Sequence, residues 1–144
     1  MCRHAAIALI IGILALTSAG CGGSKAQAPE AVVDTWSQAI NGGDDEAAAK
    51  LFAKDAVVVQ DGQRLTLATE ADALAFNASL PCGARVVEKE TDGNDVTTTF
   101  TLTRRPGHMC DGTGEAVVTV FRISDGKITL WHQLPSGAAD TQSA

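Results

Sequence analysis

The chain has 144 residues, of which 45% are hydrophobic and 19% are charged, so it is long enough for one domain and too apolar to be disordered throughout. A formal net charge of −6 and a pI of about 4.9 argue against nucleic acid as a partner, because such binders cluster Lys and Arg. The 11 basic residues are scattered, and their densest pair, Arg104-Arg105, is expected in a solvated loop.

The first twenty residues have the pattern of an export signal. Arg3 lies in a short N-terminal region, residues 5–16 form an uninterrupted apolar run, and small residues follow up to Gly20. A membrane-spanning helix needs about 20 apolar residues, and this run is shorter and has no basic stop-transfer cluster after it. We therefore interpret residues 1–20 as a signal peptide and residues 21–29 as a flexible tether, with a permanent membrane span as the less favoured alternative.

The residues around Cys21 sharpen this interpretation. The run Ser18-Ala19-Gly20-Cys21, followed by Gly22-Gly23-Ser24, resembles the lipobox of bacterial lipoproteins, although an aliphatic residue is commoner at the position of Ser18. The resemblance implies a diacylglycerol on the thiol of Cys21 and cleavage just before it. The protein would then be exported and lipid-anchored to the outer face of the bacterial cell membrane, with the membrane as its partner. The alternative is a plain signal peptide cut elsewhere and a released protein.

The cysteines outside this region form an even pair. Cys2 is removed with the signal and Cys21 is used for the lipid, which leaves Cys82 and Cys110 in an oxidising compartment. We expect a disulfide between them, worth roughly 2–4 kcal/mol. Together with His108 they also offer three soft metal ligands, but a closed zinc site needs four. We therefore expect no metal and no cofactor.

Two helices are predicted at the start of the domain. Pro29 suits the first position of a helix that presents an apolar stripe at the 3.6-residue period. The stripe consists of Val32, Val33, Trp36, Ala39 and Ile40. Residues 41–43 end this helix, and Asp44 is placed to cap a second one that is expected to stop near Lys54-Asp55. The side chains of the second helix expected to point inward are Ala48, Leu51 and Phe52.

A short hairpin and a third helix follow. Residues 56–60 and 64–67 are predicted strands, joined by a turn at Asp61-Gly62. Residues 69–72 form a capping box with Asp in place of the usual Glu or Gln, and they open an alanine-rich helix that runs to Ser79.

The second half of the chain is predicted to be sheet. Residues 85–103 contain two strands around a turn at 92–95, and residues 116–134 form a closing hairpin around Asp125-Gly126, with a long turn at 104–115 between them. Within the second strand an apolar face alternates with a face of hydroxyl groups. The residues of the hydroxyl face are Thr97, Thr99, Thr101 and Thr103.

These elements make an α+β domain over residues 30–135, with helices on one face of the sheet and a disordered tail at 136–144. The order and character of the elements resemble the nuclear transport factor 2-like superfamily, in its SnoaL-like branch. The resemblance implies a cone, in which a curved antiparallel sheet wraps around the N-terminal helices and leaves a pocket at its open end. The residues that carry it are Val33, Trp36, Ile40, Asn41 to Asp44, Ala48, Leu51, Phe52, Asp55 and the closing hairpin from Phe121 to Trp131.

The superfamily contains ketosteroid isomerases, polyketide cyclases, dehydratases and epoxide hydrolases beside non-catalytic binding modules, so the fold does not define the function. Isomerase chemistry in this fold relies on a tyrosine, and the chain has no Tyr. We expect a non-catalytic domain that binds a small apolar ligand or a protein partner. The side chains expected to line the pocket are Trp36, Phe52, Phe100, Phe121, Trp131 and His132, although the spacing of the aromatic residues also suits a hydrophobic core.

Two alternatives stay open. One is a SnoaL-like enzyme of the cyclase, isomerase or dehydratase type, in which His132 and a carboxylate, Asp55 or Asp34, transfer a proton. The other is a homodimer formed through the hydroxyl face of the sheet.

Overall fold

The structure is a computed structural model that describes residues 27–138. The expected signal peptide, the lipidation site Cys21, most of the tether and the end of the tail lie outside the described residues. The elements in chain order are α1 (Pro29–Asn41), α2 (Asp45–Ala49), β1 (Phe52–Gln60), β2 (Gln63–Leu67), α3 (Glu70–Ser79), β3 (Gly83–Asp92), β4 (Asp95–Thr103), β5 (Ala116–Ser124) and β6 (Lys127–Gln133). No helix within residues 27–138 is long and apolar enough to cross a membrane.

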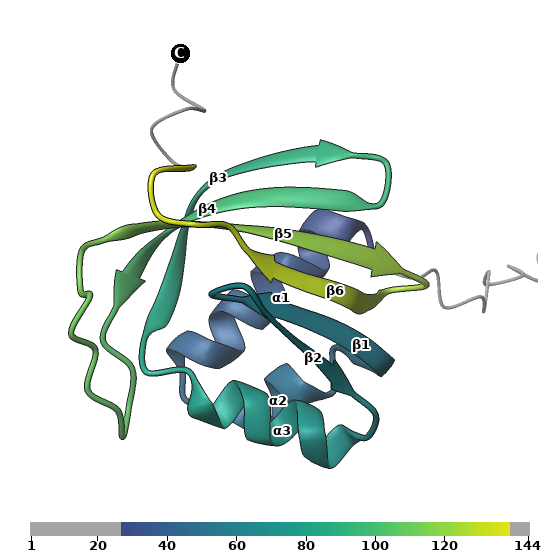
Figure 1. Ribbon diagram of the computed structural model, residues 1–144, viewed down its shortest axis with the longest axis horizontal. Coiled ribbons are helices and arrows are strands. Elements are labelled where there is room, and N and C mark those ends of the chain that lie inside the picture. The colour runs from purple at the N-terminus through teal and green to yellow at the C-terminus, as the bar shows by residue number, and fades with distance from the viewer. Residues whose placement is uncertain (1–26, 139–144) are drawn as a thin grey trace, which may run out of the picture.

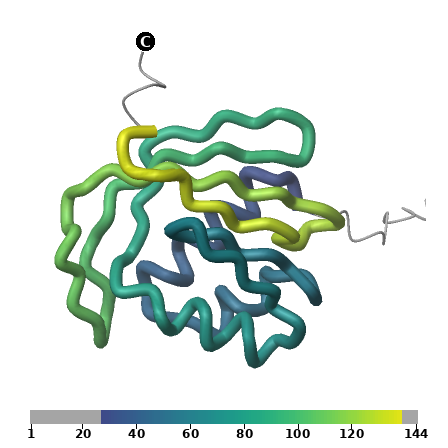
Figure 2. Tube along the Cα trace, in the orientation of Figure 1, coloured from purple at the N-terminus to yellow at the C-terminus, as the bar shows by residue number. Residues whose placement is uncertain are grey.

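The six strands form one curved sheet in the order β2-β1-β6-β5-β4-β3. The three helices lie together against one face of this sheet (Figure 1), and the chain trace shows the sheet curling around them (Figure 2). The predicted α+β architecture is therefore confirmed. Neighbouring strands are antiparallel except β1 and β6, which are parallel. This pair places the first strand of the chain beside the last one.

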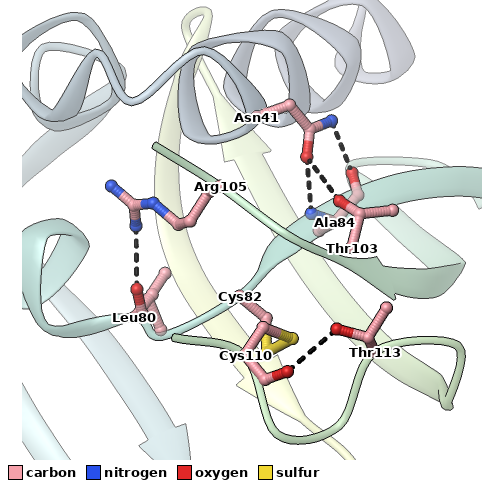
Figure 3. Close-up of a disulfide and its surroundings, with 8 residues drawn as sticks. All are labelled: Asn41, Leu80, Cys82, Ala84, Thr103, Arg105, Cys110 and Thr113. Carbon is pink, nitrogen blue, oxygen red and sulfur yellow. Dashed lines mark hydrogen bonds between the residues drawn. A yellow bond between two sulfur atoms is a disulfide. The ribbon is translucent and has the colours of Figure 1, made fainter. Parts of the chain in front are cut away.

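Helix α1 runs along the sheet, antiparallel to β3. At its start the Glu30 carboxylate accepts a hydrogen bond from Thr91 near the end of β3. At its last residue, Asn41 accepts a hydrogen bond from the backbone N–H of Ala84 at 2.7 Å and donates one to the Ala84 carbonyl at 3.1 Å (Figure 3). Gly83 is required here, because a Cβ at that position would lie 2.4 Å from Asn41 Oδ1. Helix α1 therefore extends from one end of strand β3 to the other and is attached to the strand at both ends.

Helix α2 is shorter than predicted. Asp44 caps it as expected, but it ends at Ala49 rather than near Lys54, and β1 begins at Phe52. The backbone N–H of Ile128 in β6 donates to the Leu51 carbonyl, so the parallel ladder takes over where the helix was expected to continue. A register shift between Phe52 and Val57 accommodates the change, and Asp55 lies within it with a φ of 61°.

The core is a cluster of aromatic rings between the helices and the sheet. Trp36 on α1 contacts Phe100 and Phe121 edge-on, with ring centroids 5.9 Å and 5.3 Å apart, and Phe76 on α3 contacts both Phe52 and Trp131. Edge-to-face pairs of this kind stabilise a core by roughly 0.5–1.5 kcal/mol each beyond their burial.

Arg105 departs from the sequence expectation. Arg104 is exposed as predicted, whereas the Arg105 side chain has no exposed surface. Its guanidinium donates to the Leu80 carbonyl at 2.9 Å (Figure 3). It also donates to the Asn77 carbonyl at 3.0 Å and forms an ion pair with Asp45. The guanidinium thus connects the end of α3 with the start of α2.

An exposed ion pair links β4 and β5. Arg122 donates to both carboxylate oxygens of Asp95, at 2.8 Å and 3.0 Å, and these hydrogen bonds lower the pKa of Asp95. A carboxyl whose pKa is lower in the folded than in the unfolded chain stabilises the fold above its unfolded pKa, and that stabilisation is lost as the pH falls through the folded pKa. We expect Asp95→Asn to remove a small part of the acid destabilisation below about pH 4, measured by urea unfolding at a series of pH values. The prediction would be contradicted if the free energy of unfolding had the same pH dependence in the wild-type protein and in Asp95→Asn.

Candidate functional site

A cavity of about 190 Å³ lies at the end of the sheet where β1, β4 and β6 finish. Its walls come from α1, from the segment after α3, and from five of the six strands. The lining residues are Trp36, Gln60, Leu80, Pro81, Cys82, Ala84, Phe100, Leu102, Val117, Thr119, Trp131 and Gln133.

The disulfide between Cys82 and Cys110 forms part of this wall. It joins the segment after α3 to the 104–115 turn, and the Thr113 hydroxyl donates to the Cys110 carbonyl at 2.8 Å within that turn (Figure 3). This is the pairing expected from the sequence. The bond therefore fixes one side of the cavity to the 104–115 turn.

The polar groups of the wall are neutral. Gln60 at the end of β1 donates to Gln133 at the end of β6, Nε2 to Oε1, at 2.9 Å. Trp36 Nε1 donates to Asn77 Oδ1 at 2.9 Å, whereas the buried Nε1 of Trp131 has no hydrogen-bond partner among the described residues. Among the described lining residues no side chain titrates, since Cys82 is in a disulfide. The wall therefore holds no group that could exchange a proton near neutral pH.

The family model described as a SnoaL-like domain matches residues 33–131. The chain belongs to the SnoaL-like domain family. No curated protein sequence matches this SnoaL-like chain.

Solved structures of the same fold are similar to this SnoaL-like domain at low sequence identity. A proposed polyketide cyclase from Sinorhizobium meliloti is 23% identical with a TM-score of 0.58, covering 72% of this chain and 94% of that protein. An NTF2-like protein of unknown function from Cytophaga hutchinsonii is 16% identical with a TM-score of 0.62, covering 74% and 88%. A protein with a ketosteroid isomerase-like fold from Catenulispora acidiphila, in complex with trimethylamine, is 20% identical with a TM-score of 0.56, covering 74% and 86%. These similarities support the fold.

Three of the six expected pocket residues line the cavity of this SnoaL-like domain, namely Trp36, Phe100 and Trp131. Phe121 does not, because it is completely buried between Trp36 and Phe100. Phe52 does not either, because it starts β1 at the opposite end of the sheet.

His132 lies on the wrong face for the expected pocket. Successive side chains of a strand point to opposite faces of a sheet, and Trp131 faces the core. His132 therefore faces outward, where it lines a different hollow with Val59 and Asp61.

The carboxylates considered for catalysis are not next to His132. Asp55 is exposed and precedes Val59, the partner of His132 in the parallel pair, by four residues, or about 13 Å of strand. Asp34 lies on α1, against the other face of the sheet, and accepts hydrogen bonds from Lys89 at 2.6 Å. The structure does not bring these three residues together. No group of three or more His, Cys, Asp or Glu side chains in residues 27–138 could hold a metal ion.

The two glutamines and the residues around Cys82 are part of the cavity wall without having been predicted from the sequence. Gln133 follows Trp131 by two positions and Gln60 follows the buried Val58 by two, so the strand period places both on the core face. That signal was present in the sequence. Nothing local, by contrast, indicates that Pro81 and Cys82 close the cavity, because their neighbours in it come from distant strands.

Proposed function

We propose that this protein is a lipid-anchored, extracytoplasmic SnoaL-like domain that binds a small, largely apolar ligand and does not catalyse a reaction. The observation that supports this most directly is the cavity at the end of the sheet, which is lined mainly by aromatic and aliphatic side chains and has no titratable group in its wall. Ligand sites are typically apolar with a few polar groups that orient the ligand, and this wall has that character.

The size of the cavity defines the class of ligand. A cavity of about 150 Å³ lined by apolar side chains accommodates benzene, so a cavity of about 190 Å³ suits one six-membered ring with a substituent. The solved relative from Catenulispora acidiphila is in complex with a ligand that is smaller still, trimethylamine. The side-chain amides of Gln60 and Gln133 are polar groups of the wall that can orient a ligand with a carbonyl or ether oxygen.

Catalysis by proton transfer has less support. The name of the Sinorhizobium meliloti protein suggests a cyclase, but at 23% identity the likeness concerns the fold. A general base must reach the proton that it abstracts, and the nearest candidate, His132, points to the other face of the sheet.

Tryptophan fluorescence tests the binding role directly. The chain has two tryptophans and no tyrosine, and both tryptophans line the cavity, so the intrinsic emission reports on this site. We expect cyclohexanone, a single ring with one acceptor oxygen, to change the emission with a Kd of about 1 mM, the range set by its few heavy atoms. NMR should show a shift of the Trp131 indole N–H at the same concentrations.

A matched pair of variants separates the cavity from the rest of the surface. Val117→Phe places a ring in the cavity wall and is expected to weaken ketone binding at least about tenfold, because the added side chain fills the space. Val120→Phe, on the opposite face of the same strand, should leave binding unchanged. Saturable binding that is equal in both variants, or no response of either tryptophan, would contradict the proposal.

A further inference from the structure

A second hollow, of about 380 Å³, lies at the opposite end of the sheet from the ligand cavity. Three lysines line it, Lys50 after α2, Lys54 in β1 and Lys127 at the start of β6, and its floor includes Phe52. One acidic residue, Glu70, is also part of the lining. We call this site the lysine hollow.

The lysine hollow stands out against an acidic protein. The net charge is −6, and three of the four lysines in residues 27–138 lie here, while the fourth, Lys89, is paired with Asp34. Lys50 and Lys54 are exposed, and neither forms an ion pair with another described residue. The Lys127 ammonium donates to the backbone carbonyl of Lys50, which fixes the Lys127 side chain against the end of α2. Such a cluster of ammonium groups, none of them in an ion pair with a described residue, is complementary to an anionic surface.

The position of the hollow relates it to the part of the chain that precedes the structure. Helix α1 begins beside Thr91 at the end of β3, and the pairing of the strands puts that point at the same end of the sheet as the starts of β1 and β6. The right side of Figure 1 shows this end, with the β3–β4 and β5–β6 turns. From residue 27 back to Cys21 the chain can span at most about 20 Å. A lipid on Cys21 would therefore keep this end of the domain near the bilayer.

We propose that the lysine hollow binds the headgroups of anionic phospholipids and orients the anchored domain on the membrane. This inference rests on the proposed lipid anchor. In this orientation the ligand cavity, at the other end of the sheet, opens away from the bilayer, so its ligand arrives from the aqueous side. Each lysine close to an anionic membrane surface strengthens the binding of a protein to that membrane about fivefold, and this contribution decreases within a Debye length of the surface.

The experiment uses the full protein extracted from its own membranes and placed in vesicles of phosphatidylcholine, with or without about one third phosphatidylglycerol. A water-soluble reagent that acylates amines is added, and mass spectrometry measures the labelling of each lysine together with the mass of the lipid on Cys21. We expect labelling of Lys50 and Lys54 to fall at least about fivefold in the anionic vesicles. About 1 M salt, which shortens the Debye length to about 3 Å, should restore it.

Two matched variants show whether the location of the charge matters. In the double variant Lys50→Gln/Lys54→Gln, Lys127 remains and reports on the hollow. Its acylation should then differ less than about twofold between vesicles with and without phosphatidylglycerol. Arg85→Gln/Arg104→Gln removes the same charge from exposed positions at the cavity end and should leave the protection of Lys50 and Lys54 unchanged.

The possible outcomes distinguish a failure of the proposed phospholipid contact from a failure of the proposed lipid anchor on Cys21. A lipid on Cys21 with equal lysine labelling in both kinds of vesicle would overturn the membrane contact and leave the anchor intact. Absence of the lipid mass would overturn the anchor, and the lysine hollow is then tested by adding the same vesicles to the released protein. Protection of the lysines by inorganic phosphate without vesicles would assign the hollow to a soluble anion and overturn the bilayer as its partner.

Discussion

Replacing Arg105 by Ala is expected to lower the free energy of unfolding by about 3–5 kcal/mol, because removal of one partner from a buried ion pair leaves the other groups without compensation. The Arg105 side chain has no exposed surface, and its guanidinium satisfies the carbonyls of Asn77 and Leu80 as well as the Asp45 carboxylate. Those carbonyls belong to the end of α3, where a helix leaves its last acceptors unpaired. Urea unfolding followed by circular dichroism measures the change as a shift of the midpoint at constant slope.

The neighbouring arginine provides the control. Arg104→Ala removes the same charge one residue away from an exposed side chain, and it should change stability by less than about 0.5 kcal/mol. Asp45→Asn should cost less than Arg105→Ala, because the Asp45 side chain is 21% exposed and Arg105 would keep both carbonyls. Equal effects of Arg104→Ala and Arg105→Ala would show that the buried network contributes nothing.

Arg105 also shows where sequence analysis reaches its limit. Its partners lie 25, 28 and 60 residues away in the chain, so no pattern around Arg104-Arg105 distinguishes a buried guanidinium from a solvated one. The parallel pairing of β1 with β6 is missed for the same reason, since nothing near either strand specifies a partner so distant in sequence. Contacts of this kind are fixed by the whole core and not by local propensity.

Local structures that depend on only a few neighbouring residues, such as helix caps and tight turns, are predicted correctly from the sequence. Thr69 and Asp72 form the expected capping box at the start of α3, and the turns at Asp61-Gly62 and Asp125-Gly126 have positive φ at both residues. The length of α2 was wrong, because Phe52 points inward whether its segment is helix or strand and a short apolar run does not decide between them. His132 is a different case. The strand period separates it from Trp131, so placing both residues in one pocket conflicts with a pattern that the sequence already shows.

Replacing both cysteines of the disulfide, Cys82→Ser with Cys110→Ser, is expected to lower the free energy of unfolding by roughly 3–4 kcal/mol, the loop-closure contribution for a separation of 28 residues. The same substitution should weaken cyclohexanone binding, because Cys82 lies in the cavity wall with Leu80 and Pro81. Urea unfolding and tryptophan fluorescence measure the two effects. A wild-type protein treated with a reducing agent should shift by a similar amount, and an unchanged midpoint after complete reduction would contradict the prediction.

The disulfide and Arg105 act on the same short segment, since Arg105 holds the Leu80 carbonyl and the disulfide begins two residues later at Cys82. Either one restrains the segment that closes the cavity, so their effects should not add independently. In a double-mutant cycle on the free energy of unfolding, we expect an interaction of at least about 0.5 kcal/mol between Arg105→Ala and the cysteine pair. Ketone binding should fall more in the combined variant than in either alone, because only then does the segment from Leu80 to Cys82 lose both restraints. Strict additivity of the unfolding free energies would show that the two interactions hold this part of the wall separately.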